Sequence, residues 1–66
     1  MMSKSLCMER INKFFNEREF WTTEEIYERL CSDVGMVHSK KTIQSLLRKQ
    51  YTNVNKGKYK LALWRR

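Results

Sequence analysis

The 66 residues carry a net charge of +7 and are 41% hydrophobic, which is too apolar for a disordered basic tail. A chain of this length folds as one domain, 1–66, and leaves little room for a catalytic cleft. No apolar run reaches the roughly 18 residues of a membrane span, and the first residues lack the apolar stretch of a signal peptide. We therefore expect an intracellular protein, cytoplasmic or associated with the nucleoid.

The first predicted element is an amphipathic helix over residues 4–17. Its apolar positions recur three and four residues apart, at Leu6, Cys7, Ile11, Phe14 and Phe15. A short extended segment follows at residues 19–21. Thr22 and Glu25 then have the spacing of a capping box, in which hydroxyl and carboxylate each accept a backbone N–H of the other residue. This pair predicts a second helix over residues 23–32.

A turn is predicted after the second helix, because Gly35 can adopt a left-handed backbone conformation. Ser39 is a suitable N-cap for a third helix over residues 39–50, whose apolar positions are Ile43, Leu46 and Leu47. Beyond it the period changes to two, which predicts a hairpin over about residues 52–64 with Tyr59, Leu61 and Leu63 on its buried face. The tight reversal falls at residues 55–58, where Gly57 can take a positive φ.

The charges are segregated along the chain. Residues 1–33 hold five basic and all seven acidic side chains, whereas residues 34–66 hold nine basic side chains and no acidic one. A basic region of this kind is typical of a protein whose partner carries many negative charges, of which the nucleic-acid backbone is the commonest.

The order of elements resembles the winged-helix variant of the helix-turn-helix DNA-binding domain, from about Leu6 to Trp64. The resemblance depends on the second helix that Thr22 begins, the Gly35 turn, the basic third helix and the run Lys56-Gly57-Lys58-Tyr59-Lys60-Leu61. It implies an α+β fold of three helices with a C-terminal β-hairpin, or wing. It also implies that the third helix enters the major groove of double-stranded DNA while the hairpin contacts the flanking backbone.

The expected contact residues lie on the third helix, opposite Ile43, Leu46 and Leu47. Gln44 and Arg48 have the hydrogen-bonding groups to read adenine and guanine edges. Phosphate contacts are expected from the start of the helix and from the wing. The complete predicted set is Ser39, Lys40, Lys41, Gln44, Ser45, Arg48, Lys56, Lys58 and Lys60.

One branch of this family binds left-handed DNA, and Lys40, Lys41, Ile43 and Trp64 are similar to its pattern. Gln44 and Arg48, however, replace the Asn and Tyr of that branch, and the chain has no proline where the branch has two. Right-handed duplex is therefore the expected target.

Other functions stay open at this point. A winged-helix module that docks an acidic protein is the main alternative to a small transcriptional regulator, and binding to RNA or single strands is a third hypothesis. The modest affinity of one small module favours a homodimer on two half-sites. No set of His, Cys, Ser or carboxylate groups has the spacing of a catalytic or metal site. We therefore expect no enzymatic activity, no cofactor and no small-molecule substrate.

The cysteines and aromatic residues are assigned mainly to the interior. Cys7 and Cys31 are expected to be buried free thiols, and Phe20, Tyr27 and Tyr59 to pack in the core or hairpin. Trp64 alternates to the face opposite Tyr59, and three roles remain open for it: packing on Trp21, a dimer interface, or contact with nucleic acid.

Overall fold

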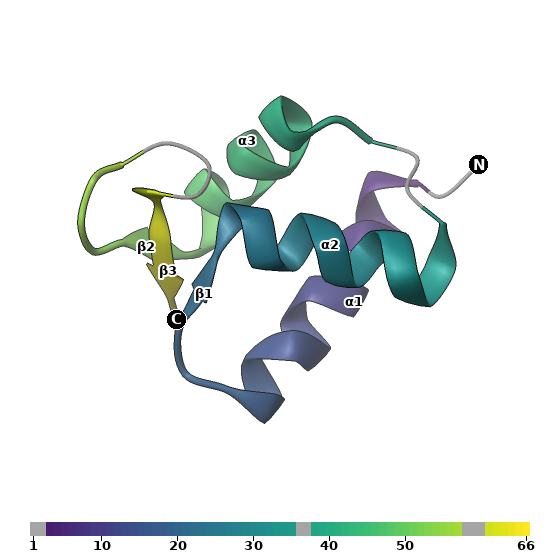
Figure 1. Ribbon diagram of the computed structural model, residues 1–66, viewed down its shortest axis with the longest axis horizontal. Coiled ribbons are helices and arrows are strands. Elements are labelled where there is room, and N and C mark those ends of the chain that lie inside the picture. Colours follow the sequence, from purple (N-terminus) through teal and green to yellow (C-terminus); the bar gives the residue numbers. More distant parts are fainter. Residues whose placement is uncertain (1–2, 36–37, 58–60) are drawn as a thin grey trace.

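The computed structural model describes residues 3–35, 38–57 and 61–66. Within them the chain has the expected α+β class, with three helices and a three-stranded antiparallel sheet in the order β1-β3-β2. The elements are α1 (Lys4–Glu17), β1 (Trp21–Thr22), α2 (Thr23–Val34), α3 (Lys40–Gln50), β2 (Thr52–Asn53) and β3 (Leu63–Arg65). The helices lie to one side of the sheet, with α2 crossing between α1 and α3 (Figure 1).

A side chain caps the start of each helix. Ser39 Oγ accepts the Thr42 N–H at 3.2 Å at the start of α3. The capping box of α2 is complete, because the Thr22 hydroxyl accepts the Glu25 N–H at 3.1 Å and the Glu25 carboxylate accepts the Thr22 N–H at 3.0 Å. Helix α2 continues to Val34, beyond the predicted end, and stops at Gly35, whose φ is 69°. The positive φ agrees with the expectation, but a ψ of 124° places Gly35 outside the left-handed helical region.

The core lies where the helices meet the sheet. Trp21 of β1 and Trp64 of β3 are opposite each other in the strand register, and both are buried. Phe15 of α1 stacks on Tyr51, which follows α3, with ring centroids 4.3 Å apart. The Trp21 indole N–H donates to the Phe14 carbonyl at 2.9 Å, so this large ring brings no unsatisfied donor into the interior.

The predicted buried face of the last strand is wrong. Ala62 and Trp64 point into the core, whereas Leu61 is 66% exposed and Leu63 is partly exposed. A shift of one residue moves every side chain of a strand to the other face. The Trp64 ring, only 1% exposed, determines the direction here because it is the largest apolar group available to fill the space beside β1. Tyr59 lies outside the described residues.

The predicted role of Gly57 is also wrong. The residue with positive φ in this turn is Lys56, at 56°. At Gly57 the constraint is steric, since a Cβ there would lie 2.2 Å from the backbone oxygen of Leu61. Asn53 and Asn55 hold the turn, because Asn53 Nδ2 donates to the Gly57 carbonyl at 2.8 Å and Asn55 Oδ1 accepts the Gly57 N–H at 3.2 Å. The glycine therefore permits the two arms of the wing to approach.

Three side chains assigned to the interior are more exposed than predicted. Cys7 is a buried free thiol, as expected, but Cys31 is exposed. Cys31 lies about 100° around the helix from Leu30, which is off the buried stripe that Ile26 and Leu30 form. Phe20 is 39% exposed, and Tyr27 is only partly buried.

Candidate nucleic-acid interface

Four exposed residues form the outer face of α3: Lys41, Ser45, Arg48 and Lys49. Spacings of four, seven and eight residues place them on one side of the helix. Helix α3 has no carboxylate, and its three outer-face cations take part in none of the ion pairs among the described residues. Their charge is therefore available to an external anion.

Gln44 is not on this face. We expected its amide to read base edges, but the side chain is only 6% exposed. With about 100° per residue, the exposed stripe of α3 is rotated by roughly 50° away from the predicted one, toward Ser45 and Lys49. Lys49, which is not in the predicted contact set, lies on this stripe as a result.

A buried hydrogen-bond chain explains why Gln44 turns inward. The Trp64 indole N–H donates to the Thr23 hydroxyl at 2.7 Å, and this hydroxyl donates to Gln44 Oε1, also at 2.7 Å. Gln44 Nε2 in turn donates to the Gly57 carbonyl at 3.4 Å. This series of hydrogen bonds, through Trp64, Thr23, Gln44 and Gly57, joins β3, α2, α3 and the wing. Every buried side-chain polar atom in the described residues has a partner, so the network is satisfied.

Lys40 also turns toward the protein. Its ammonium lies 2.7 Å from Glu24 Oε1 on α2 and 5.1 Å from the centre of the Tyr27 ring. The hydrogen bond to Glu24 raises the pKa of the Lys40 ammonium above its usual value. Lys40 and Gln44 together form the inner edge of α3, and both bind other parts of the chain.

The remaining predicted contact residues lie on the surface or outside the described part. Ser39 is exposed, and its hydroxyl accepts the Thr42 N–H as the cap of α3. Lys56 is exposed in the wing. Lys58 and Lys60 lie outside the described residues. The structure thus brings Lys41, Ser45 and Arg48 together and separates them from Gln44 and Lys40.

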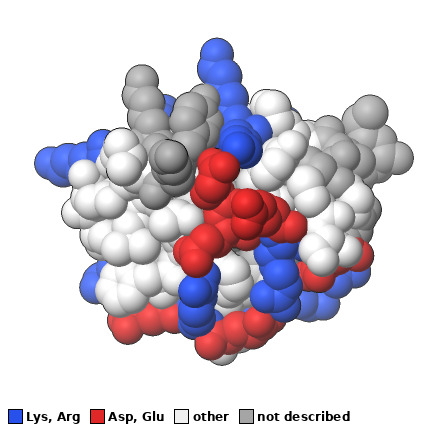
Figure 2. All heavy atoms as spheres, viewed as in Figure 1, with Lys and Arg blue, Asp and Glu red and all other residues white. Residues whose placement is uncertain are grey.

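Most of the ion pairs among the described residues lie within residues 1–33, which hold both basic and acidic side chains, and one pair, Lys40–Glu24, joins the two halves of the chain. Figure 2 shows acidic side chains over the middle and lower part of one face, with basic side chains among them. Glu25 pairs with Arg18 and Glu17 with Arg29, each at 2.9 Å. Burial by itself would raise the pKa of the Glu25 carboxyl, but hydrogen bonds from the Thr22 N–H and from Arg18 outweigh it and lower the pKa. Much of the acidic charge is thereby neutralised within the protein.

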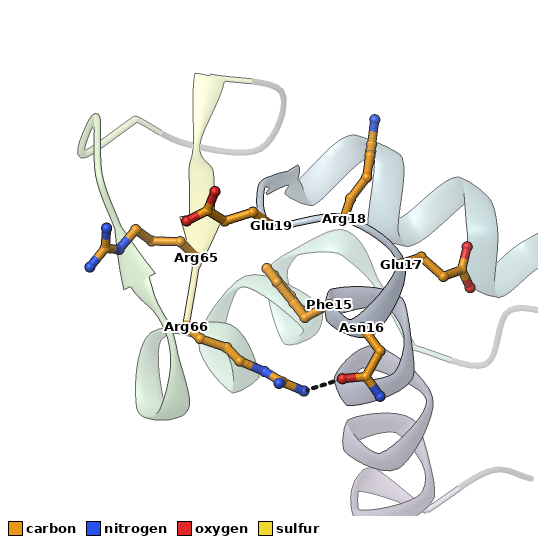
Figure 3. A pocket seen from close by; sticks show the side chains of 7 residues that line it. All are labelled: Phe15, Asn16, Glu17, Arg18, Glu19, Arg65 and Arg66. Carbon is orange, nitrogen blue, oxygen red and sulfur yellow. Dashed lines mark hydrogen bonds between the residues drawn. The ribbon is translucent and has the colours of Figure 1, made fainter.

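The C-terminal arginines behave differently from each other. Arg66 donates to the Asn12 carbonyl at 3.0 Å and to Asn16 Oδ1 at 3.1 Å, so it is attached to α1. Figure 3 shows its side chain reaching toward Asn16, while the Arg65 side chain points away from that helix. Both line a depression of about 400 Å³ that also contains Glu17 and Glu19. Arg18 also lines this depression, so its charged side chains are of mixed sign, three arginines and two carboxylates.

Two further kinds of functional group are possible metal ligands and the buried thiol of Cys7. In residues 3–35, 38–57 and 61–66, no group of three or more His, Cys, Asp or Glu is placed to hold a metal ion. Burial raises the pKa of the Cys7 thiol, which keeps it in the neutral, unreactive form.

Thr23 is a buried structural residue, central to this hydrogen-bond network, that the sequence interpretation missed. Its hydrogen-bond partners, Gln44 and Trp64, are 21 and 41 positions away. No local spacing rule detects such pairs. The one sequence feature that could have pointed to Thr23 is its position directly after the capping Thr22. A Thr in the first turn of a helix is common, so this position does not indicate a buried hydrogen bond.

Among the described residues, none of the helices has the length and apolar character that crossing a membrane requires. Neither a comparison with protein-family models nor searches of curated proteins and of solved structures found a match to this chain.

Proposed function

We propose that this chain is a winged-helix domain that binds double-stranded DNA without catalysing a reaction, as a small transcriptional regulator does. The outer face of α3 lies in the major groove, and the wing, with Lys56, lies against the flanking backbone. The supporting observation is that Lys41, Arg48 and Lys49 share one exposed face with Ser45 and have no ion-pair partner among the described residues.

The first turn of α3 adds to this argument. Its peptide dipoles place a partial positive charge at the helix start, which carboxylates often compensate. Helix α2 has Glu24 and Glu25 in its first turn, whereas α3 has none of its own. Glu24 reaches α3 only through Lys40, on the inner edge. The outer face therefore keeps a positive potential, which suits a phosphate backbone.

The outer-face residues divide by chemistry. Arg48 has a planar guanidinium that can bind guanine through two parallel hydrogen bonds, so we assign base recognition to it. Lys41 and Lys49 are compact charges on flexible stems and suit phosphates. Gln44, being buried, has no part in this assignment.

A fluorescence-anisotropy titration tests the proposal. The chain is titrated with a random duplex, a single strand and an acidic polypeptide at several salt concentrations. We expect duplex binding that weakens with salt, with a logarithmic slope of about 0.9 for each phosphate neutralised. No duplex binding at low salt would overturn the proposal. Binding to the polypeptide alone would identify an adaptor for acidic proteins.

The division of roles has its own test, once a preferred DNA sequence has been selected from a random library. Arg48→Ala should weaken binding to that sequence by about 1 to 3 kcal/mol more than binding to random duplex. Lys41→Ala should weaken both equally. Equal losses for both variants on both duplexes would contradict the assignment of Arg48 to base recognition.

A further inference from the structure

A basic depression of about 200 Å³ lies where the start of α1 meets the outer face of α3. Lys4, the first residue of α1, lines it together with Lys41 and Lys49 of α3. The hydroxyl-bearing residues Thr42 and Ser45 lie between the two α3 lysines along the helix and line the same depression. Two elements far apart in the sequence thus contribute three lysines, two hydroxyl-bearing residues and the apolar Leu46 to one hollow.

The charge of this depression differs from that of two other depressions on the described surface. The one near Arg66 is lined by three arginines and by Glu17 and Glu19. The one beside Trp21 is lined by two arginines and by three carboxylates, from Glu17, Glu25 and Glu28. No carboxylate lines the depression at Lys4. All three of its lysines are exposed, and none is in an ion pair within the described residues.

We propose that this depression binds the phosphate backbone of one strand of duplex DNA, so that the interface extends from α3 onto the first turn of α1. The ammonium groups neutralise the phosphate charge, and the Ser45 and Thr42 hydroxyls donate to phosphate oxygens. This inference rests on the proposed function, because the depression shares Lys41, Ser45 and Lys49 with the outer face of α3.

Lys4 is the residue that distinguishes this inference from the proposed function alone. It lies outside α3 and outside the wing, so DNA held only by those elements would not contact it. Lys41 and Lys49 are eight residues apart, which is about 12 Å along the helix axis at 1.5 Å per residue. The depression is therefore extended along α3, as a strand of backbone requires, and Lys4 closes it from the side of α1.

The test compares Lys4→Ala with Lys13→Ala in titrations of the full chain against a random duplex at several salt concentrations. Both variants remove one exposed lysine from α1, so they change the net charge equally. Lys13 does not line the depression. We expect Lys4→Ala to reduce the salt slope by about 0.9 and the affinity by about eightfold at 0.1 M salt, and Lys13→Ala to change the affinity less than about twofold. Far-ultraviolet circular dichroism checks that both variants fold.

Each other outcome counts against the inference in a distinct way. If Lys41→Ala lowers duplex affinity and Lys4→Ala does not, DNA binds α3 but not the depression, and the proposed function stands without this extension. Equal losses from Lys4→Ala and Lys13→Ala indicate a general effect of net charge and also overturn the extension. If the unmodified chain binds no duplex, the proposed function fails, and this inference fails with it.

Discussion

The inner edge and the outer face of α3 both carry polar side chains, in neighbouring positions, but these side chains have different surroundings. On the inner edge, the Lys40 ammonium binds Glu24, and the Gln44 amide joins Thr23 to Gly57. On the outer face, Lys41 and Ser45, one residue further along in each case, are exposed. One helix thus presents a polar side that stabilises the fold and another that is available to a partner.

This difference shows that a polar side chain on a helix is not by itself a contact residue. A polar side chain is available to a partner only where no other element of the fold reaches that part of the helix. The inner edge faces the start of α2 and the wing, and both offer groups that pair with Lys40 and Gln44. Three predictions, ordered by expected free energy, test how different the two sides are, and a fourth, with the smallest effect, concerns the cap of α2.

The largest effect is expected from Gln44→Ala. This change removes the hydrogen bonds of the Gln44 amide to Thr23 and Gly57, leaves the Thr23 hydroxyl without that acceptor and creates a small cavity. It should therefore lower the free energy of unfolding by about 2 to 3 kcal/mol. Ser45→Ala, the matched change on the outer face, should lie within about 0.5 kcal/mol of the unmodified chain. Urea unfolding measures both values, and similar losses would remove the distinction between the two sides.

A second prediction concerns the wing that closes the inner edge. Gly57→Ala should destabilise the fold by about 2 kcal/mol, because the added methyl group meets the Leu61 backbone and the arms of the wing must move apart. Lys56→Gly should not destabilise it, since glycine accepts the positive φ found there without steric cost. Thermal unfolding distinguishes the pair, and a stable Gly57→Ala variant would mean that the wing arms are further apart than described.

A third prediction compares lysines of the two sides in duplex binding. Lys41→Ala should weaken binding about eightfold at 0.1 M salt, or about 1.2 kcal/mol. The double variant Lys40→Gln with Glu24→Gln removes an internal ion pair and leaves the net charge unchanged, so affinity should stay within about twofold. Anisotropy titrations give both numbers. A large loss in the double variant would place Lys40 in the interface.

The smallest effect concerns the capping box of α2 and its dependence on pH. The pKa of Glu25 is lowered in the folded protein, so its contribution to stability is present above its unfolded-state pKa and is lost as the pH falls through the folded-state pKa. Glu25→Gln should cost less than about 1 kcal/mol at neutral pH, because the carboxylate is partly solvated and water screens its ion pair with Arg18.

Urea unfolding of the Glu25→Gln variant and the unmodified chain, from neutral pH down to below the usual carboxyl range, checks this sign. The difference between the two chains should shrink as the pH falls. A difference that grows toward acid pH would contradict the assignment of the capping carboxylate.

The sequence alone determined the local structure. The spacing of Ile11, Phe14 and Phe15, and the caps at Thr22 and Ser39, predict helices close to those observed. These signals are readable because their partners lie three or four residues away, within one turn of helix. Gly35, with its positive φ at the end of α2, is a local signal of the same kind.

The tertiary structure alone decided which polar and apolar groups face inward. Gln44 is buried because Thr23 and Gly57 offer hydrogen bonds from other elements, and Lys40 is paired because α2 brings Glu24 to it from 16 positions away. Which residues of β3 point into the core follows from the space that the Trp64 ring fills beside β1. Alternation and helical spacing define which residues share a face, but which face turns inward depends on neighbours that only the folded chain brings together.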